Sequence, residues 1–186
     1  MNVYLKDLVA LHDNPKFVVD VGGYLGDYAS EVYKQFQSNV LIFEPLTDYA
    51  DICSDRFTNN PNIKIIRMAL GGSKGEAVIY KSKEASSLFQ GLAMKGVEDG
   101  QEVVPAGKLS DFMRDDVDVL KLNCEGGEYE ILYDLIETGW LPKIPEILIQ
   151  FHRMKSHRDM FSELQEQLSK THELTKLEKW QLWKKI

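Results

Sequence analysis

Short apolar runs alternate with amphipathic stretches along most of the chain. The runs are rich in β-branched residues and lie at 17–21, 40–44, 63–67, 117–122 and 146–151. Most of them are too apolar for a strand with one face in water, so they predict parallel strands that are covered on both faces. Helical patterns at 27–37, 47–58 and 128–138 follow the first, second and fourth runs, and the last ends at Gly139. The alternation predicts an α/β, doubly wound and mostly parallel sheet.

The rest of the chain adds a few elements to this pattern. Glycines after the third run predict turns, and "EAVIYK" predicts a further strand. The Gly- and Ser-rich stretch at 82–107 is expected to be a loop or lid. A helix at about 156–170 should lead to two last strands, joined near Lys179. We see no repeat and no linker, so residues 1–186 are expected to form a single domain.

Composition and charge narrow the class of partner. The 186 residues carry a net charge of −7, with 44% apolar and 27% charged residues, which is typical of a soluble globular protein. No block of Lys and Arg is longer than a pair, which argues against a broad surface for duplex nucleic acid and favours small molecules or glycans. No apolar run approaches the roughly 20 residues of a membrane span, and no cleavage site follows the start, so we expect a cytoplasmic protein. Cys53 and Cys124 lack metal-site spacing and are expected to be buried free thiols.

The loop "DVGGYLGDY" after the first run is the place where doubly wound folds bind nucleotides. It fails the dinucleotide pattern because Val21 stands where the first glycine is needed. Asp20 and Asp27 would also repel a pyrophosphate. A cationic ligand without phosphate fits better, and S-adenosylmethionine is such a ligand. The alternative is a tight turn with no ligand.

Individual residues can be matched to that cofactor. Gly22 and Gly26 would let the backbone approach it closely, and Asp20 could accept a hydrogen bond from its ammonium group. Glu44, at the end of the next run, could accept two hydrogen bonds from the ribose diol, and Pro45 would end that strand.

The motifs "VVDVGGYLGDY", "LIFEP", "RMALGG", "VLKLNCEGGEYEIL" and "EILIQFH" occur in this order. In sequence and spacing, residues 17–152 resemble the FkbM-like S-adenosylmethionine-dependent methyltransferases. The resemblance implies a seven-stranded sheet with an antiparallel last strand, and O-methylation of a hydroxyl on a sugar, a glycan or a small natural product. It also implies a set of cofactor-binding positions, namely Asp20, Gly22, Gly23, Gly26, Glu44, Pro45, Met68, Ala69 and Asn123. The alternative for Ala69 is core packing.

Four residues at the ends of the fourth and fifth runs are candidates for chemistry. Many relatives have acids where this chain has Asn123 and Gln150, so we expect no metal site, because amides are poor ligands for hard cations. Asn123 could orient the methionine moiety or the acceptor, and Gln150 is expected to contact the acceptor. His152 shares a strand face with Gln150 and is the expected general base, unless it is structural. Glu125 is expected either to bind cofactor or acceptor, or to cap the turn.

Several nearby residues have competing interpretations. Glu128 lies in the first turn of the next helix, which favours a structural role. Lys121 should either extend outward or pair with Glu44 or Glu125. Ser86 and Ser87 could touch the acceptor or form a plain turn. Tyr24 and Tyr28 are expected to be packed rather than to contact the cofactor.

The leading hypothesis is therefore an S-adenosylmethionine-dependent O-methyltransferase. A second hypothesis is a catalytically silent module that keeps the cofactor fold but only binds a ligand or partner, because two carboxylates of the family are replaced by amides. A third, a nicotinamide-dependent oxidoreductase, is disfavoured by the missing glycine and by the two aspartates of the loop.

Overall fold

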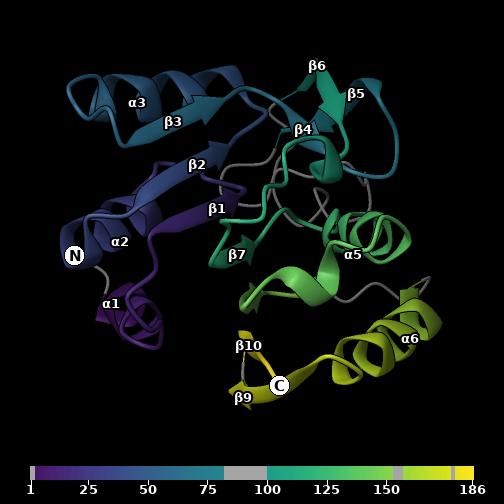
Figure 1. Cartoon of the computed structure of the whole chain (residues 1–186). Coiled ribbons are helices and arrows are strands. Elements are labelled where there is room, and N and C mark those ends of the chain that lie inside the picture. The colour runs from purple at the N-terminus through teal and green to yellow at the C-terminus, as the bar shows by residue number, and fades with distance from the viewer. Residues whose placement is uncertain (1–2, 82–99, 153–156, 177–178) are drawn as a thin grey trace.

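A seven-stranded sheet forms the centre of the molecule (Figure 1). The structure is a computed structural model that describes residues 3–81, 100–152, 157–176 and 179–186. The strand order is β3-β2-β1-β7-β8-β10-β9, with β10 antiparallel to both of its neighbours and the other pairs parallel. This confirms the predicted α/β class and the antiparallel last strand. The strands are β1 Phe17–Val21, β2 Asn39–Phe43, β3 Ile63–Ile66, β7 Val119–Leu122, β8 Glu146–Ile149, β9 His172–Lys176 and β10 Gln181–Lys185.

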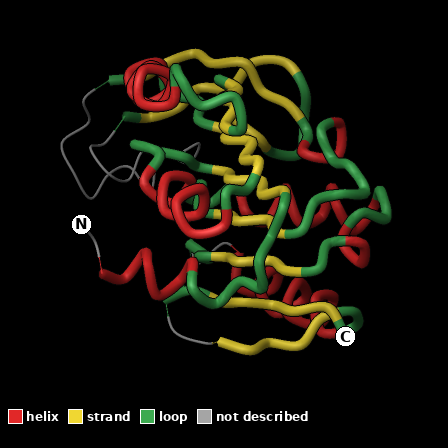
Figure 2. The backbone as a smooth tube through the Cα atoms, turned by 60° about the vertical axis from the view of Figure 1, so that its left-hand side comes forward, coloured by secondary structure: helices red, strands yellow, loops and turns green. Residues whose placement is uncertain are grey.

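Helices cover both faces of this sheet, as the side view in Figure 2 shows. One face carries α1 (Val3–Val9), α2 (Asp27–Phe36) and α3 (Thr47–Phe57). The other face carries α5 (Glu128–Glu137), α6 (Arg158–Ser169) and the short 3-10 helix η1 (Leu109–Asp111). Because side chains alternate along a strand, Val18 packs with the first group of helices and Val19 with the second. Burial on both faces explains why the strands are continuously apolar.

A second, three-stranded sheet has the order β4-β6-β5, with β4 at Ala69–Leu70, β5 at Gly75–Tyr80 and β6 at Gln101–Gly107. β5 confirms the strand expected in "EAVIYK". The loop expected at 82–107 is wrong for its last seven residues, because these form β6, which pairs with both β5 and β4. Exposed positions alternate with partly or fully buried ones from Gln101 to Ala106 of β6, and the strand contains Pro105, so it lacks the apolar run that reveals the strands of the large sheet. Residues 82–99 lie outside the described residues.

The end of α5 agrees with the sequence pattern. Gly139 has φ +72°, the left-handed conformation expected of a glycine after a helix. The short 3-10 helix η2 (Leu141–Lys143) follows before β8. No helix in the described ranges is long and apolar enough to cross a membrane.

Replacing Gly139 with alanine should lower the free energy of unfolding by about 1 kcal/mol, because an L side chain is strained at positive φ. A Cβ at this position meets no atom within 4 Å, so the loss would come from the backbone alone. Gly139→Asn is the matched control and should lose less, since asparagine tolerates this conformation. Urea denaturation measures both values, and equal losses in the two variants would contradict the explanation.

Candidate active site

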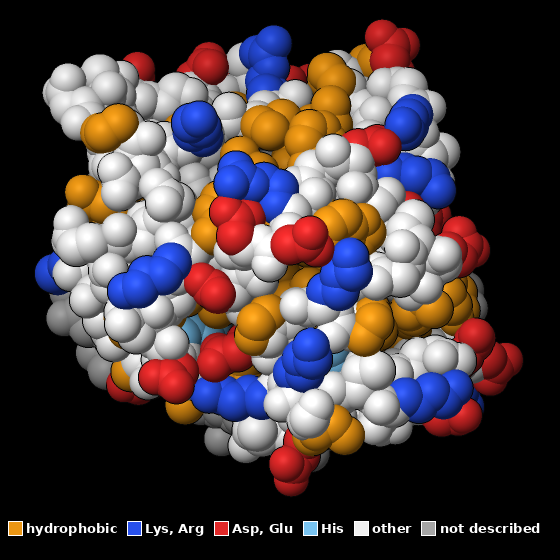
Figure 3. Space-filling view, in the orientation of Figure 1, with side chains coloured by type: hydrophobic (Ala, Val, Ile, Leu, Met, Phe, Trp, Pro, Cys, Tyr) orange, Lys and Arg blue, Asp and Glu red, His pale blue; other side chains and the backbone are white. Residues whose placement is uncertain are grey.

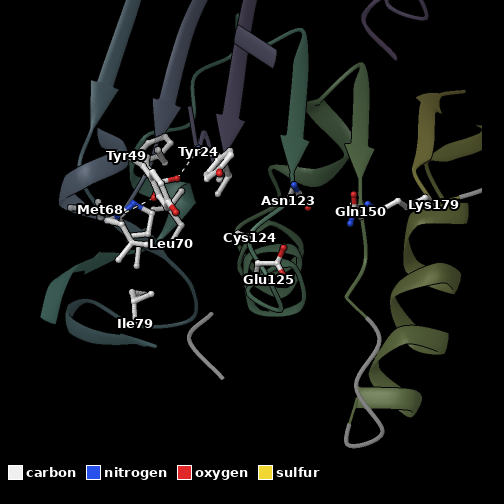
Figure 4. A pocket seen from close by; sticks show the side chains of 17 residues that line it. Tyr24, Tyr49, Met68, Leu70, Ile79, Asn123, Cys124, Glu125, Gln150 and Lys179 are labelled. Atoms are coloured by element: carbon white, nitrogen blue, oxygen red, sulfur yellow. Dashed lines mark hydrogen bonds between the residues drawn. The ribbon is translucent and has the colours of Figure 1, made fainter. Parts of the chain in front are cut away.

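A cavity of about 290 Å³ opens at the carboxyl ends of β1, β2, β7 and β8 (Figure 4). Small-molecule sites are found at this edge in doubly wound folds, and their volumes start at about 300 Å³. Eight residues that the sequence singled out line the cavity: Gly22, Glu44, Pro45, Met68, Ala69, Asn123, Glu125 and Gln150. The structure thus brings together residues that lie more than 120 positions apart in the chain.

The three glycines of the first loop differ in what they do. Gly22 lines the cavity at φ +80°, and a Cβ there would collide with the backbone carbonyl of Asn123. Gly23 and Gly26 do not line it. A Cβ on Gly23 would meet Ile42, and one on Gly26 would meet the ring of Phe57 at 2.7 Å. These two glycines allow the loop and α2 to pack on the sheet and on α3, a role that the glycine spacing did not distinguish from ligand contact.

Glu44 is a buried carboxylate at one end of the cavity. Its two oxygens accept hydrogen bonds from the backbone N–H groups of Tyr24 (2.8 Å) and Leu46 (3.1 Å). Burial raises the pKa of Glu44 to about 7, against the opposing effect of these two bonds. Each oxygen has a further lone pair, so the carboxylate has the acceptor capacity that a ribose diol needs.

Asn123 lies at the end of β7, toward the other side of the cavity (Figure 4). Its side-chain oxygen is buried and has no hydrogen-bond partner among the described residues. A buried polar atom without a partner is costly, and a ligand that donates a hydrogen bond would remove that cost. The ammonium group of a methionine moiety is such a donor. Glu44 and Asn123 therefore fit the two polar parts of S-adenosylmethionine.

Asp20 does not reach the cavity, contrary to the expectation that it accepts from the cofactor. It is fully buried, and Lys121 Nζ donates to its Oδ1 at 2.7 Å and to the carbonyl of Gly22 at 2.7 Å. The expected pairing of Lys121 with Glu44 or Glu125 is therefore wrong. β1 and β7 are neighbours, and their register places Asp20 opposite Lys121. Through Lys121, the loop that follows β1 is tied to the neighbouring strand β7.

The turn "CEGGE" is built around Glu128. Its buried carboxylate folds back to accept from the backbone N–H groups of Cys124 (2.8 Å) and Gly126 (2.9 Å). This confirms the structural role expected for Glu128, although its partners lie in the turn itself. Glu125 has φ +51°, which is unusual for a residue other than glycine, and its side chain lines the cavity. Strained backbone of this kind often accompanies a functional site.

His152 lies between the two acids of the turn. Its Nδ1 is 2.9 Å from Glu128 Oε1, and its Nε2 is 3.1 Å from Glu125 Oε1. Burial disfavours the charged imidazole, but the hydrogen bonds and charges of the two carboxylates outweigh it and raise the pKa of His152 to about 9. An imidazolium has no lone pair to accept a proton, which weighs against His152 as a base at neutral pH.

The cavity also contains residues that the sequence did not assign to it. Tyr24 and Tyr49 lie edge to face with ring centres 4.6 Å apart, and both line the cavity, so the packed role expected for Tyr24 is incomplete. Tyr28 is buried, as expected. The position of Tyr24 within the glycine loop was a usable signal. Val21 and Phe43, the last residues of β1 and β2, also line it. The set is completed by Leu46, Leu70, Ile79, Cys124 and Lys179. No local pattern marks these five, because tertiary contacts alone bring them to the cavity.

Both cysteines are free, as predicted. Cys53 is buried, whereas Cys124 is only partly buried and lines the cavity. Ser86 and Ser87, which the sequence suggested for the acceptor, lie outside the described residues.

Comparison with known families decides the class. The sequence model described as "Methyltransferase FkbM domain" matches residues 20–171, which is most of the chain. The chain belongs to the FkbM methyltransferase family. No curated protein sequence matches it. Residues 20–171 include each of the cavity-lining positions named above except Lys179.

Solved structures agree on the fold. Methyltransferase FkbM from Methylobacillus flagellatus KT is 13% identical, with a TM-score of 0.61 over 92% of this chain and 44% of that one. An rRNA methylase from Streptococcus thermophilus is 14% identical (TM-score 0.54, 98% and 94% covered). A methyltransferase from Podospora anserina with bound SAH is 9% identical (TM-score 0.56, 98% and 76% covered). The chain thus spans less than half the length of the first of these proteins. All three structures share the class I methyltransferase fold with this chain.

Proposed function

We propose that this FkbM-family chain is an S-adenosylmethionine-dependent methyltransferase that O-methylates a hydroxyl of a sugar, a glycan or a small natural product. One observation carries the cofactor assignment. A buried carboxylate, Glu44, and a buried amide oxygen without a partner, Asn123 Oδ1, face one cavity from different strands. A ligand that carries a diol and an ammonium group would satisfy both. Met68 and Ala69 line the same cavity and offer a surface for the adenine.

The reaction asks little covalent chemistry of the protein. S-adenosylmethionine supplies an electrophilic methyl group on a positively charged sulfur. The acceptor oxygen takes the methyl group and releases its proton, so the chain must align the hydroxyl and take up the proton. Glu125 is the carboxylate that lines the cavity on the β7 side, and His152, itself in contact with Glu128, holds it. We assign Glu125 as the proton acceptor, Asn123 as an orienting residue and His152 as a positioning residue.

The acceptor is argued from charge. One structural neighbour is an rRNA methylase, but RNA binding depends on clustered cations. The chain has a net charge of −7, and on the face that Figure 3 shows, basic side chains are interspersed with acidic ones. A glycan or small-molecule acceptor is therefore favoured over a polynucleotide.

The first test is binding of S-adenosylhomocysteine. At 100 times its dissociation constant, a ligand that binds only the folded state should stabilise the protein by about 2.7 kcal/mol. Stabilisation of the protein by NADH, with none by S-adenosylhomocysteine, would reject the proposal. Incubation with labelled cofactor and panels of glycans, small hydroxyl compounds and RNA then tests the reaction. Cofactor binding without transfer to any acceptor would favour the silent binding module, and transfer only to RNA would refute the acceptor class.

Replacing Glu44 with glutamine should weaken S-adenosylhomocysteine binding about 10- to 100-fold, because hydrogen bonds to a charged acceptor are worth about 1–2 kcal/mol more than neutral ones. The ribose needs the ionised acid, so wild-type binding should tighten as the pH rises through about 7, the pKa of Glu44. The glutamine variant should show no such change. Calorimetry across pH 6–8 checks both statements, with Glu130→Gln as a control on α5; unchanged affinity in Glu44→Gln would remove the ribose assignment.

A further inference from the structure

Two donors meet at the end of the cavity formed by β8 and β10. Gln150 directly follows β8, and Lys179 precedes β10 by two residues. Ile149 pairs with Gln181, so the two strands bring these neighbouring positions to the same end of the sheet. Both side chains line the cavity, and Lys179 extends toward Gln150 in Figure 4. This end lies across the cavity from Tyr49 and Met68, which belong to the cofactor side (Figure 4).

The contacts of His152 fix the orientation of the Gln150 amide. Carboxylates of Glu125 and Glu128 stand at the two ring nitrogens, at 3.1 and 2.9 Å, and an ionised carboxylate only accepts, so both nitrogens donate. Gln150 Nε2 lies 3.3 Å from His152 Nε2, which would set two donors against each other. A flip of the amide exchanges its nitrogen and oxygen and removes this conflict. Beside a donating nitrogen, the amide must present its oxygen to the ring. Its NH2 group is then left to the cavity.

Lys179 supplies a charge beside that NH2 group. It is the only Lys or Arg among the described residues that line the cavity. Within the described ranges it forms no salt bridge, whereas Lys121 in β7 is paired with Asp20. The cationic end of Lys179 therefore has no protein partner in this part of the molecule.

We propose that Lys179 and Gln150 form a subsite for an anionic oxygen group, a carboxylate or a phosphate, carried by the molecule that is methylated. This inference rests on the proposed function and narrows its acceptor to an acidic hydroxyl compound. An ammonium group beside an amide NH2 matches an anionic group with several acceptor oxygens. The acidic group would anchor the acceptor at Lys179 and direct one of its hydroxyls toward Glu125.

The experiment compares matched ligands by calorimetry on protein loaded with S-adenosylhomocysteine. Methyl glucuronide against methyl glucoside tests a carboxylate, and glucose 6-phosphate against glucose tests a phosphate. At least one acidic ligand should bind at least tenfold more tightly than its neutral partner. Lys179→Met should abolish this preference while leaving cofactor-product binding unchanged. Lys185→Met changes an exposed lysine at the far end of β10, is the matched control and should keep the preference.

Equal binding of acidic and neutral ligands, binding of neither acidic ligand, or a preference retained in Lys179→Met would overturn the subsite. The same titrations on protein without S-adenosylhomocysteine separate this inference from the proposed function. If the protein does not bind S-adenosylhomocysteine, the methyltransferase assignment fails. The preference for an acidic ligand can still be measured on the protein alone. The two ligand pairs also distinguish a carboxylate from a phosphate.

Discussion

Replacing Lys121 with methionine should lower the free energy of unfolding by about 3–5 kcal/mol at neutral pH. Lys121 and Asp20 are both buried, and their side chains meet at 2.7 Å. Removing one partner of a buried ion pair leaves the other charge without compensation, and this is the costly change. The lysine also donates to the carbonyl of Gly22, so the loop after β1 would lose its hydrogen bond to β7.

The pH dependence of this loss has a definite sign. Burial raises the pKa of Asp20 above its usual 3.8, and Lys121 opposes that rise. Without Lys121 the pKa should rise further, so Asp20 in the variant takes up a proton more readily on folding. The loss of stability should be complete above that raised pKa and should shrink as the pH falls toward 3.8.

Urea denaturation at several pH values measures the effect. Adding Asp20→Asn to Lys121→Met should recover most of the loss, because neither charge then remains buried. Lys143→Met removes an ion pair with Asp115 in which both side chains are more than half exposed, and it should cost less than about 1 kcal/mol. A Lys121→Met loss no larger than that of Lys143→Met would contradict the argument.

The fold could be predicted from the sequence because its strands are buried on both faces. This burial forces a continuous apolar run, and all five runs became strands of the large sheet. β6 lacks such a run. It lies in the small sheet with one partly exposed face, so its residues alternate and one is Pro105. Its pairing with β5 is a tertiary contact that periodicity cannot reveal.

The site was predictable to the extent that strand ends define it. Glu44 and Asn123 follow β2 and β7 directly, and topology alone carries them to one cavity. Asp20 is also near a strand end, but it lies within β1, and its side chain points to Lys121 on the neighbouring strand. The sequence shows that Asp20 and Glu44 each lie at or near the end of a strand. It does not show which of them has a cation beside it.

Replacing Glu125 with glutamine should lower kcat by about 10²- to 10⁴-fold, the usual contribution of a general base. Glutamine keeps the size of the side chain and can still accept from His152 Nε2, so cofactor-product binding should be retained. Glu130→Gln is the control: it changes a glutamate on α5 that accepts from the backbone of Gly72, and it should leave kcat within about twofold. Single-turnover methyl transfer measures the effect. A Glu125→Gln enzyme with wild-type kcat would remove this residue from the chemistry.

The pH profile of kcat then separates the two possible roles of His152. A base must lose its proton to act, so with a pKa of about 9 a catalytic His152 would make the rate rise through pH 9. A positioning imidazolium holds Glu125 and Glu128 only while it is charged, so the rate should instead fall there. The stability that comes from the raised pKa of His152 is complete below pH 6.5 and is lost as the pH rises through 9. The free energy of unfolding should therefore fall over the same pH range as the rate. We expect the falling profile, because the two carboxylates that hold His152 are also the groups that keep it protonated.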